Sequence, residues 1–129
     1  MTDPGSSRAR GRAVEVLVGE HLERHGLQIL ARNVELAAAE LDLVALDPRG
    51  AEEIIVFVEV RSRSTTECGT PIETIGRAKQ TRLIRAATAW LVQRGLWERV
   101  PVRFDVVGVV TDGASVRDLE WIEDAFSSG

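Results

Sequence analysis

The sequence lacks several features that mark particular classes of protein. It has one cysteine, Cys68, which excludes an internal disulfide and suits a reducing compartment. No apolar run approaches the roughly 20 residues of a membrane-spanning helix, and residues 1–12 lack the apolar segment of a secretory signal. Internal repeats and low-complexity segments are also missing. We therefore expect a soluble cytoplasmic protein, and its 129 residues suffice for one domain.

Lysine is scarce as well, because Lys79 is the one lysine among sixteen basic residues. The formal net charge of -4 argues weakly against a nucleic-acid partner, but the charges are unevenly distributed. Residues 61–103 carry nine basic and three acidic side chains, whereas residues 104–129 carry one basic and six acidic ones. This asymmetry allows a phosphate-binding face on an acidic protein. The candidates for contacts with a nucleic-acid backbone are Arg63, Arg77, Arg82 and Arg85, unless these arginines only form a solvated helix face.

Apolar periodicity predicts a single α/β domain over residues 10–129, preceded by a disordered leader at residues 1–9. A helix is expected from about residue 10 to His25, because apolar residues recur at helical spacing as far as Leu22. Gly26 then ends this helix.

Three strands are expected to follow this helix, at residues 27–33, 40–47 and 53–63. The segment Asp47-Pro48-Arg49-Gly50 has the composition of a turn. It predicts that the last two of these strands form an antiparallel hairpin.

A second helix is the best-marked element of the chain. Thr70 is a preferred N-cap residue, Pro71 suits the first helical position, Glu73 completes a capping box, and Gly95 ends the helix. Two more strands are expected, at residues 100–110 and 115–126, the last of them at a sheet edge. The predicted order is helix, strand, strand, strand, helix, strand, strand. This order indicates a central mixed five-stranded sheet flanked by helices.

Two acidic residues lie inside otherwise apolar strands. Asp42 stands in LDLVAL and Glu59 in IIVFVEV, on strands predicted to be neighbours. Burial of an unpaired carboxylate is costly, and a metal ion would remove that cost. Magnesium takes oxygen ligands and is usually held by one or two carboxylates with water and substrate phosphate. Asp42 and Glu59 are therefore candidate metal ligands.

A salt bridge would remove the same cost without a metal. Arg61, two residues after Glu59, and Arg103 are the possible partners. Arg103 and Asp105 share one face of their strand, so we expect them to pair with each other or with neighbouring strands. A role for Arg103 in holding Asp42 or Glu59 stays open.

An ordered set of short segments resembles the YraN-like family of uncharacterised bacterial proteins. The resemblance runs from about residue 11 to residue 126 and rests on Glu15, AELDLVA, FVEVRSR, Gly69, Pro71, Lys79-Gln80 and RFDVV. That family is placed in the restriction-endonuclease-like fold and resembles archaeal Holliday-junction resolvases. The resemblance implies a site built from the helix residue Glu15, the strand residue Asp42, and Glu59 followed two residues later by a lysine, here Arg61.

The chain departs from the family pattern at Arg61, and also at Val14 and Ala39, which replace glycines. In such sites lysine positions or deprotonates the attacking water, whereas arginine keeps its proton and cannot act as a base. Arg61 could still contact the phosphate while the metal lowers the pKa of its bound water. Lys79 is an alternative, because it falls near the centre of the apolar stripe of the second helix. Its stem could equally cross that apolar surface and bring the ammonium to water.

Two hypotheses follow. In the first, the protein is a Mg²⁺- or Mn²⁺-dependent endonuclease that acts on branched or otherwise structured DNA. Asp42 and Glu59 bind the metal together with the main-chain carbonyl of Val60, and Glu15 assists. Arg61 or Lys79 then stabilises the phosphate. The candidate catalytic residues are Asp42, Glu59, Arg61, Lys79 and Glu15.

In the alternative, the protein is a catalytically inactive module of the same fold that binds nucleic acid or a protein partner. Arg61 then neutralises Asp42 and Glu59 in place of a metal. The sequence leaves open whether the chain is an enzyme and whether its partner is DNA or RNA. It marks no subunit interface, although a junction-cutting role would suggest a homodimer.

Overall fold

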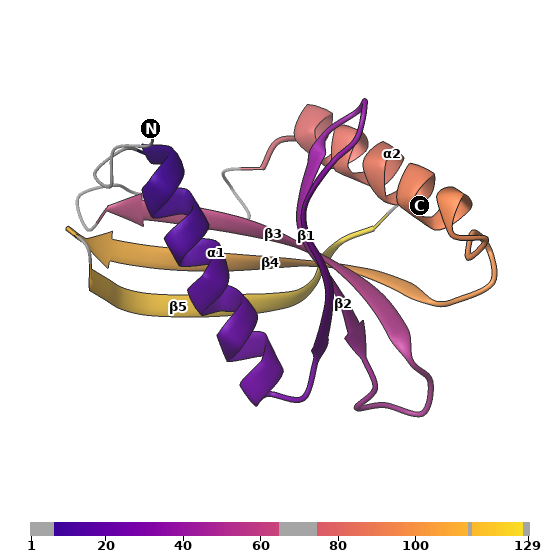
Figure 1. The fold of residues 1–129 in the computed structure, drawn as a ribbon, viewed down its shortest axis with the longest axis horizontal. Helices are drawn as coiled ribbons and strands as arrows, with labels where there is room; N and C mark the ends of the chain where they lie inside the picture. Colours follow the sequence, from indigo (N-terminus) through magenta and orange to yellow (C-terminus); the bar gives the residue numbers. More distant parts are fainter. Residues whose placement is uncertain (1–6, 65–74, 114, 128–129) are drawn as a thin grey trace.

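A computed structural model describes residues 7–64, 75–113 and 115–127, with the side chains of residues 7–10 outside that description. Seven elements follow one another in the predicted order (Figure 1). They are α1 (Ser7–Arg24), β1 (Gln28–Glu35), β2 (Glu40–Asp47), β3 (Ile54–Ser64), α2 (Arg77–Gln93), β4 (Val102–Asp112) and β5 (Ser115–Phe126). The α/β class and the order of elements predicted from the sequence are confirmed.

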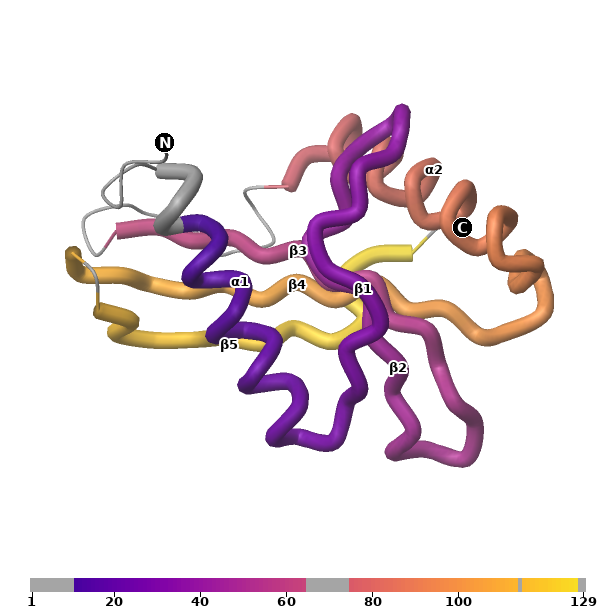
Figure 2. The backbone as a smooth tube through the Cα atoms, viewed as in Figure 1, coloured from indigo at the N-terminus to yellow at the C-terminus, as the bar shows by residue number. Residues whose placement is uncertain are grey.

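The five strands form one mixed sheet in the order β1-β2-β3-β4-β5. Only the β3–β4 pair is parallel, and the other three pairs are antiparallel. The predicted β2–β3 hairpin and the edge position of β5 are therefore confirmed. The sheet is strongly twisted, so that β1 and β2 run across the direction of β4 and β5 (Figure 2).

α1 covers one face of the sheet because its apolar stripe is fully buried there. Val14, Val18 and Leu22 pack against strand residues of the same face, which include Leu43, Ala45, Val56, Val58, Val107 and Val109. Figure 1 shows α1 lying across this face. Burying each of these aliphatic side chains contributes about 1.5–3 kcal/mol before entropic costs.

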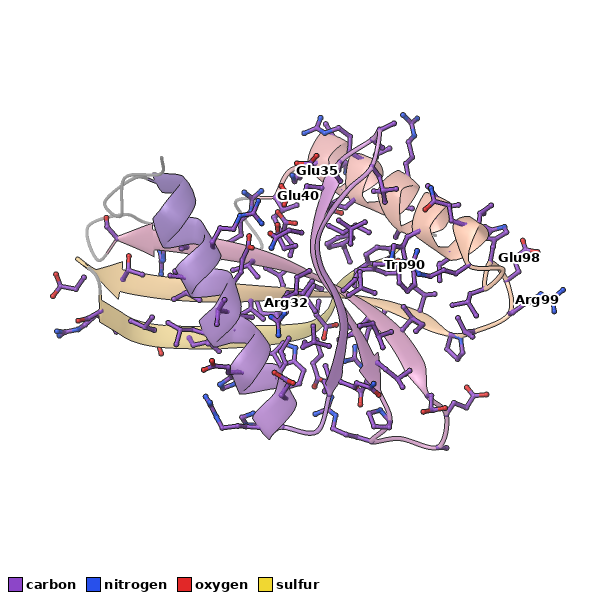
Figure 3. All side chains as sticks on the ribbon, viewed as in Figure 1. Arg32, Glu35, Glu40, Trp90, Glu98 and Arg99 are labelled. Carbon is purple, nitrogen blue, oxygen red and sulfur yellow. The ribbon has the colours of Figure 1, made fainter. Side chains whose placement is uncertain are left out.

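α2 covers the opposite face through a second apolar cluster. Leu83, Ala86 and Trp90 of α2 are buried with Phe57 and Phe104 of the sheet. The Trp90 ring meets Phe57 edge-on at 5.7 Å between centroids, an arrangement that aromatic quadrupoles favour. Trp90 points from α2 into the interior (Figure 3). The site described below lies at one end of this face.

Both helices begin at residues that the sequence did not predict. α1 starts at Ser7, inside the segment expected to be a disordered leader, and residues 1–6 lie outside the described residues. α2 starts at Arg77, because Gly76 has an extended backbone and stands at the N-cap. The predicted cap at residues 70–73 lies outside the described residues.

Among the described residues, no helix combines the length and the apolarity that crossing a membrane requires.

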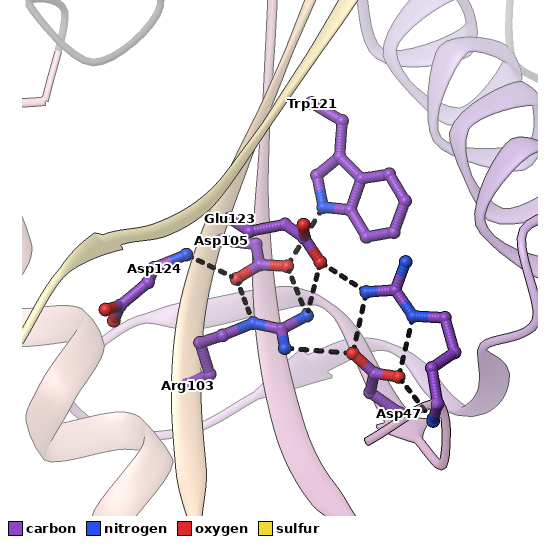
Figure 4. Close-up of polar contacts among 7 residues, drawn as sticks. Asp47, Arg103, Asp105, Trp121, Glu123 and Asp124 are labelled. Atoms are coloured by element: carbon purple, nitrogen blue, oxygen red, sulfur yellow. Dashed lines mark hydrogen bonds and ion pairs between the residues drawn. The ribbon is translucent and has the colours of Figure 1, made fainter.

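A buried ion-pair network joins strands that are not neighbours in the sheet (Figure 4). Arg103 of β4 donates two hydrogen bonds to Asp105, at 2.8 and 3.0 Å, and a third across β3 to Asp47 of β2, at 2.9 Å. Asp105 is fully buried and also accepts from the Trp121 indole at 2.9 Å. Hydrogen bonds from Arg49 hold the pKa of Asp47 well below its usual range. Arg103 thus belongs to this network and contacts neither Asp42 nor Glu59 through any interaction found among the described residues.

Replacing Arg103 by alanine should destabilise the fold by about 3–5 kcal/mol, because it leaves the buried Asp105 without its counter-ion. The matched control is Arg117→Ala, which removes an exposed pair with Asp112 and should change stability by less than about 1 kcal/mol. Urea denaturation at neutral pH measures both values. Equal losses in the two variants would contradict a stabilising role for the network.

Candidate functional site

The candidate site lies where β2 and β3 stop pairing. The last pair of their ladder is Leu43 with Val58, so Asp42 and Glu59 come next on the two strands. Continued register places these two side chains opposite one another and on one face, because directly opposed residues share a face. The Val60 N–H donates to Asp42 Oδ2 at 2.9 Å. The Asp42 carboxylate therefore takes a backbone donor at the point where the ladder ends.

The two carboxyl groups are close enough to share a hydrogen bond. Glu59 is only 7% exposed, and burial, reinforced by the nearby charge of Asp42, raises the pKa of Glu59 to about 8. Burial also raises the pKa of Asp42, although the Val60 N–H opposes that shift. The pair therefore holds a proton to higher pH than ordinary carboxyl groups do, and the two groups are placed to share it.

Two cationic side chains approach the same oxygen of this pair. Arg61 Nε and Lys79 Nζ each lie 3.9 Å from Glu59 Oε1. Arg61 reaches it from the same face of β3, and Lys79 reaches it from the first turn of α2. Lys79 therefore points toward the carboxylates, which is one of the two orientations that the sequence left open. Two cations from different elements, Arg61 of β3 and Lys79 of α2, thus lie beside Glu59.

Glu15 of α1 lies close enough to Asp42 for the two charges to interact. Burial raises the pKa of Glu15 to about 7, and the charges of Asp42 and Glu40 add to this shift. Arg12 and a hydrogen bond from the side chain of Asn33 act in the opposite direction. A cleft between α1 and the β1–β2 edge is lined by Gly11, Arg12, Glu15, Asn33 and Glu40. The structure therefore brings Glu15 into the electrostatic reach of the carboxylate pair.

A second pocket is lined by both carboxyl residues and by apolar side chains of the α2 face. These are Leu41, Asp42, Phe57, Val58, Glu59, Leu83, Phe104 and Phe126. Its apolar walls exclude water from the buried side of the pair, which is the physical origin of the raised pKa values.

Acidic, histidine and cysteine side chains of the described residues do not form a group of three or more that could hold a metal. The candidate donor set is therefore the Asp42–Glu59 pair with main-chain oxygen. The carbonyl of Val60 is suited to join it, since the N–H and C=O of one strand residue point to the same side and the N–H faces Asp42.

The predicted phosphate contacts fall on two elements near the pair. Arg77, Arg82 and Arg85 are exposed on α2, and Arg63 is partly buried on β3. Sequence reasoning missed Asn33, whose backbone is left-handed with φ 51°. A single asparagine at the end of a strand was the available signal.

Glu40 was also missed as a neighbour of Glu15. It pairs with Glu35 across the β1–β2 hairpin (Figure 3). Its position in the alternation with Asp42 was the signal that could have identified it.

Comparison with solved structures gives a weak likeness. Pyrococcus furiosus SfsA, solved in complex with Ca²⁺, aligns over 92% of this chain with a TM-score of 0.33 and 17% identity. The chain spans 64% of the length of that protein.

The sequence comparisons are much closer. A UPF0102 protein of Pseudomonas aeruginosa strain LESB58 is 46% identical over 129 residues, which cover 99% of this chain and 100% of the relative. A UPF0102 protein of Stutzerimonas stutzeri is 43% identical over 122 residues, covering 95% and 98% of the two chains. The sequence model of the uncharacterised protein family UPF0102 matches residues 14–109, which include every residue of the carboxylate site. The chain therefore belongs to the UPF0102 family, as its YraN-like motifs predicted.

Proposed function

We propose that the protein is a Mg²⁺- or Mn²⁺-dependent endonuclease that cleaves phosphodiester bonds in DNA, with branched DNA as the substrate class that the family resemblance implies. The observation that carries the proposal is the buried Asp42–Glu59 pair, with Arg61 and Lys79 both 3.9 Å from one oxygen of Glu59. Two acidic and two basic side chains lie together here on an otherwise apolar face of the sheet. This combination suits a metal and a phosphate together.

The residues present fit a divalent cation bound through oxygen. Two carboxyl groups that share a proton would present two anionic oxygens once that proton left, and the Val60 carbonyl would add a third donor. A bound ion would supply Lewis acidity and an activated water. Asp42 and Glu59 would hold it, and Glu15 would assist from α1.

The two cations would have separate tasks in this proposal. Arg61 keeps its proton, so it serves as a contact for the phosphate and as a counter-charge for the transition state. Lys79, on a flexible stem, would position the attacking water or share the phosphate. We place this reaction in the cytoplasm, which the single Cys68 suits.

A second candidate is a catalytically inactive module that binds nucleic acid or a protein partner. The observation that favours it is the same pair of cations, because Arg61 and Lys79 could neutralise Glu59 without any metal. The tests of metal binding and of cleavage that follow separate the two candidates.

Metal binding should release a proton, and the metal-free site should weaken the fold as pH rises. The pKa of Glu59 is about 8 in the folded protein against an ordinary value of 4.5. The folded state thus holds the extra proton, and stability is lost as pH increases between these values. Glu59→Gln should therefore gain stability relative to the native protein toward pH 8 in the presence of a chelator, as measured by urea denaturation.

Calorimetric titration with Mn²⁺ near pH 7, in buffers of different ionisation enthalpy, measures the proton release. The native protein should release close to one proton per ion, and Asp42→Asn should bind no ion. Stability profiles that stay parallel in native protein and Glu59→Gln, together with no Mn²⁺ uptake, would favour the inactive module.

Cleavage should depend on the acids and discriminate between the two cations. With Mg²⁺ or Mn²⁺, native protein should cut labelled four-way-junction DNA faster than duplex or single-stranded DNA. Glu59→Gln should abolish this cleavage, whereas the exposed control Glu120→Gln on β5 should leave it unchanged. Lys79→Ala should slow cleavage more than Arg61→Lys if Lys79 acts on the water.

Two outcomes would count against this assignment. Equal cleavage by native protein and Glu59→Gln would remove the site from the reaction. Activity that appears only in Arg61→Lys would mean that the natural chain has lost catalysis.

DNA binding should depend on the exposed arginines of α2. Arg82→Ala and Arg85→Ala should each weaken binding to all DNA sequences about equally and reduce the slope of log affinity against log salt by about one. The control Arg117→Ala, on β5, should keep the native slope. Fluorescence anisotropy at several salt concentrations measures this, and native slopes in all the variants would exclude α2 as the DNA contact.

A further inference from the structure

Asn33 occupies a conformation that few residues accept inside a strand. Its φ of 51° is left-handed, and asparagine tolerates this region better than most residues. It lies on β1 between Arg32 and Val34, which pair with Leu43 and Leu41 of β2. Asn33 therefore stands across from Asp42 on the neighbouring strand.

The side chain of Asn33 meets Glu15 in the cleft between α1 and the β1–β2 edge. Both side chains line that cleft together with Glu40, and Asn33 acts on Glu15 to lower the pKa of its carboxyl group. This direction is the one expected when the Asn33 amide N–H faces the ionised carboxylate, which only accepts. Among the described residues, Glu15 Oε2 and Asn33 Oδ1 are buried and accept no hydrogen bond. Two oxygens are thus held ready for a donor that the described part of the chain does not supply.

We propose that Asn33 is a positioning residue, which fixes the Glu15 carboxylate beside Asp42 so that Glu15 Oε2 and Asn33 Oδ1 together accept from a water of the bound cation. This inference rests on the proposed function, since it gives Glu15 its place in the same site. An amide suits the task because it donates to the carboxylate through nitrogen while its oxygen remains an acceptor. An aspartate at this position could not donate, and a glycine could adopt the backbone without holding Glu15.

Selective labelling tests the contact directly, because Asn33 is the only asparagine of the chain. Incorporation of ¹⁵N-asparagine gives a single side-chain amide pair in the NMR spectrum. Its shifts should follow the ionisation of Glu15, with a midpoint near the pKa of about 7. In Glu15→Gln this step should vanish. An amide whose shifts are the same function of pH in both proteins would overturn the proposal, whether or not the protein cleaves DNA.

Single-turnover cleavage of junction DNA at saturating protein tests the consequence. Asn33→Gly and Asn33→Asp should each slow cleavage about 10- to 100-fold, as loss of an orienting partner typically does, with DNA affinity unchanged. In the Glu15→Gln background, Asn33→Gly should add little, because the two residues act as a unit. If Asn33 served only the left-handed backbone, Asn33→Gly would cleave at the native rate, and that result would overturn the proposal.

The two failures remain distinguishable. A native protein that cleaves no DNA with either metal contradicts the proposed function, whereas the NMR comparison decides the Asn33–Glu15 contact in that case as well. A native protein that cleaves, with Asn33→Gly equally active, leaves the proposed function standing and removes Asn33 from it.

Discussion

The structure depends at its functional end on one unfavourable arrangement, two carboxyl groups held side by side with little access to water. The β2–β3 ladder ends at the pair Leu43–Val58, one residue away from Asp42 and from Glu59. The two strands therefore bring these side chains together just beyond their last paired residues. The Val60 N–H, Arg61 and Lys79 lower the cost of this arrangement, but the pKa of Glu59 is still raised to about 8. A carboxyl pair that carries such a cost has a physical reason to bind a cation.

The same fold solves a second burial problem in a different way. Asp105 is fully buried too, yet Arg103, the Trp121 indole and the Asp124 N–H satisfy both of its oxygens. The described residues thus supply donors to each oxygen of Asp105. The contrast between the saturated Asp105 and the under-compensated Asp42–Glu59 pair distinguishes a stabilising ion pair from a candidate binding site. Burial alone does not distinguish Asp105 from the Asp42–Glu59 pair, whereas the number of donors around each does.

The sequence predicted the parts of the fold and of the site that depend on local sequence pattern. Alternating apolar residues identified β2 and β3, and the turn at residues 47–50 made them a hairpin, so the meeting of Asp42 and Glu59 followed. The apolar stripe of α2 likewise placed Lys79 inward. The predicted start of α2 was wrong, because the extended backbone of Gly76 places the first helical residue at Arg77. Asn33 and the link from Arg103 to Asp47 could not be predicted, since the first needs a left-handed backbone and the second crosses an intervening strand.

The central claim is that Asp42 and Glu59 form a cation site. The most direct measurement is the anomalous diffraction of a crystal grown with Mn²⁺, which locates the ion without reference to any activity. The account predicts an anomalous peak bridging the carboxylates of Asp42 and Glu59, within coordination distance of the Val60 carbonyl. A site that shows Lys79 and Arg61 closed onto Glu59, with no peak between the acids at saturating Mn²⁺, would contradict it.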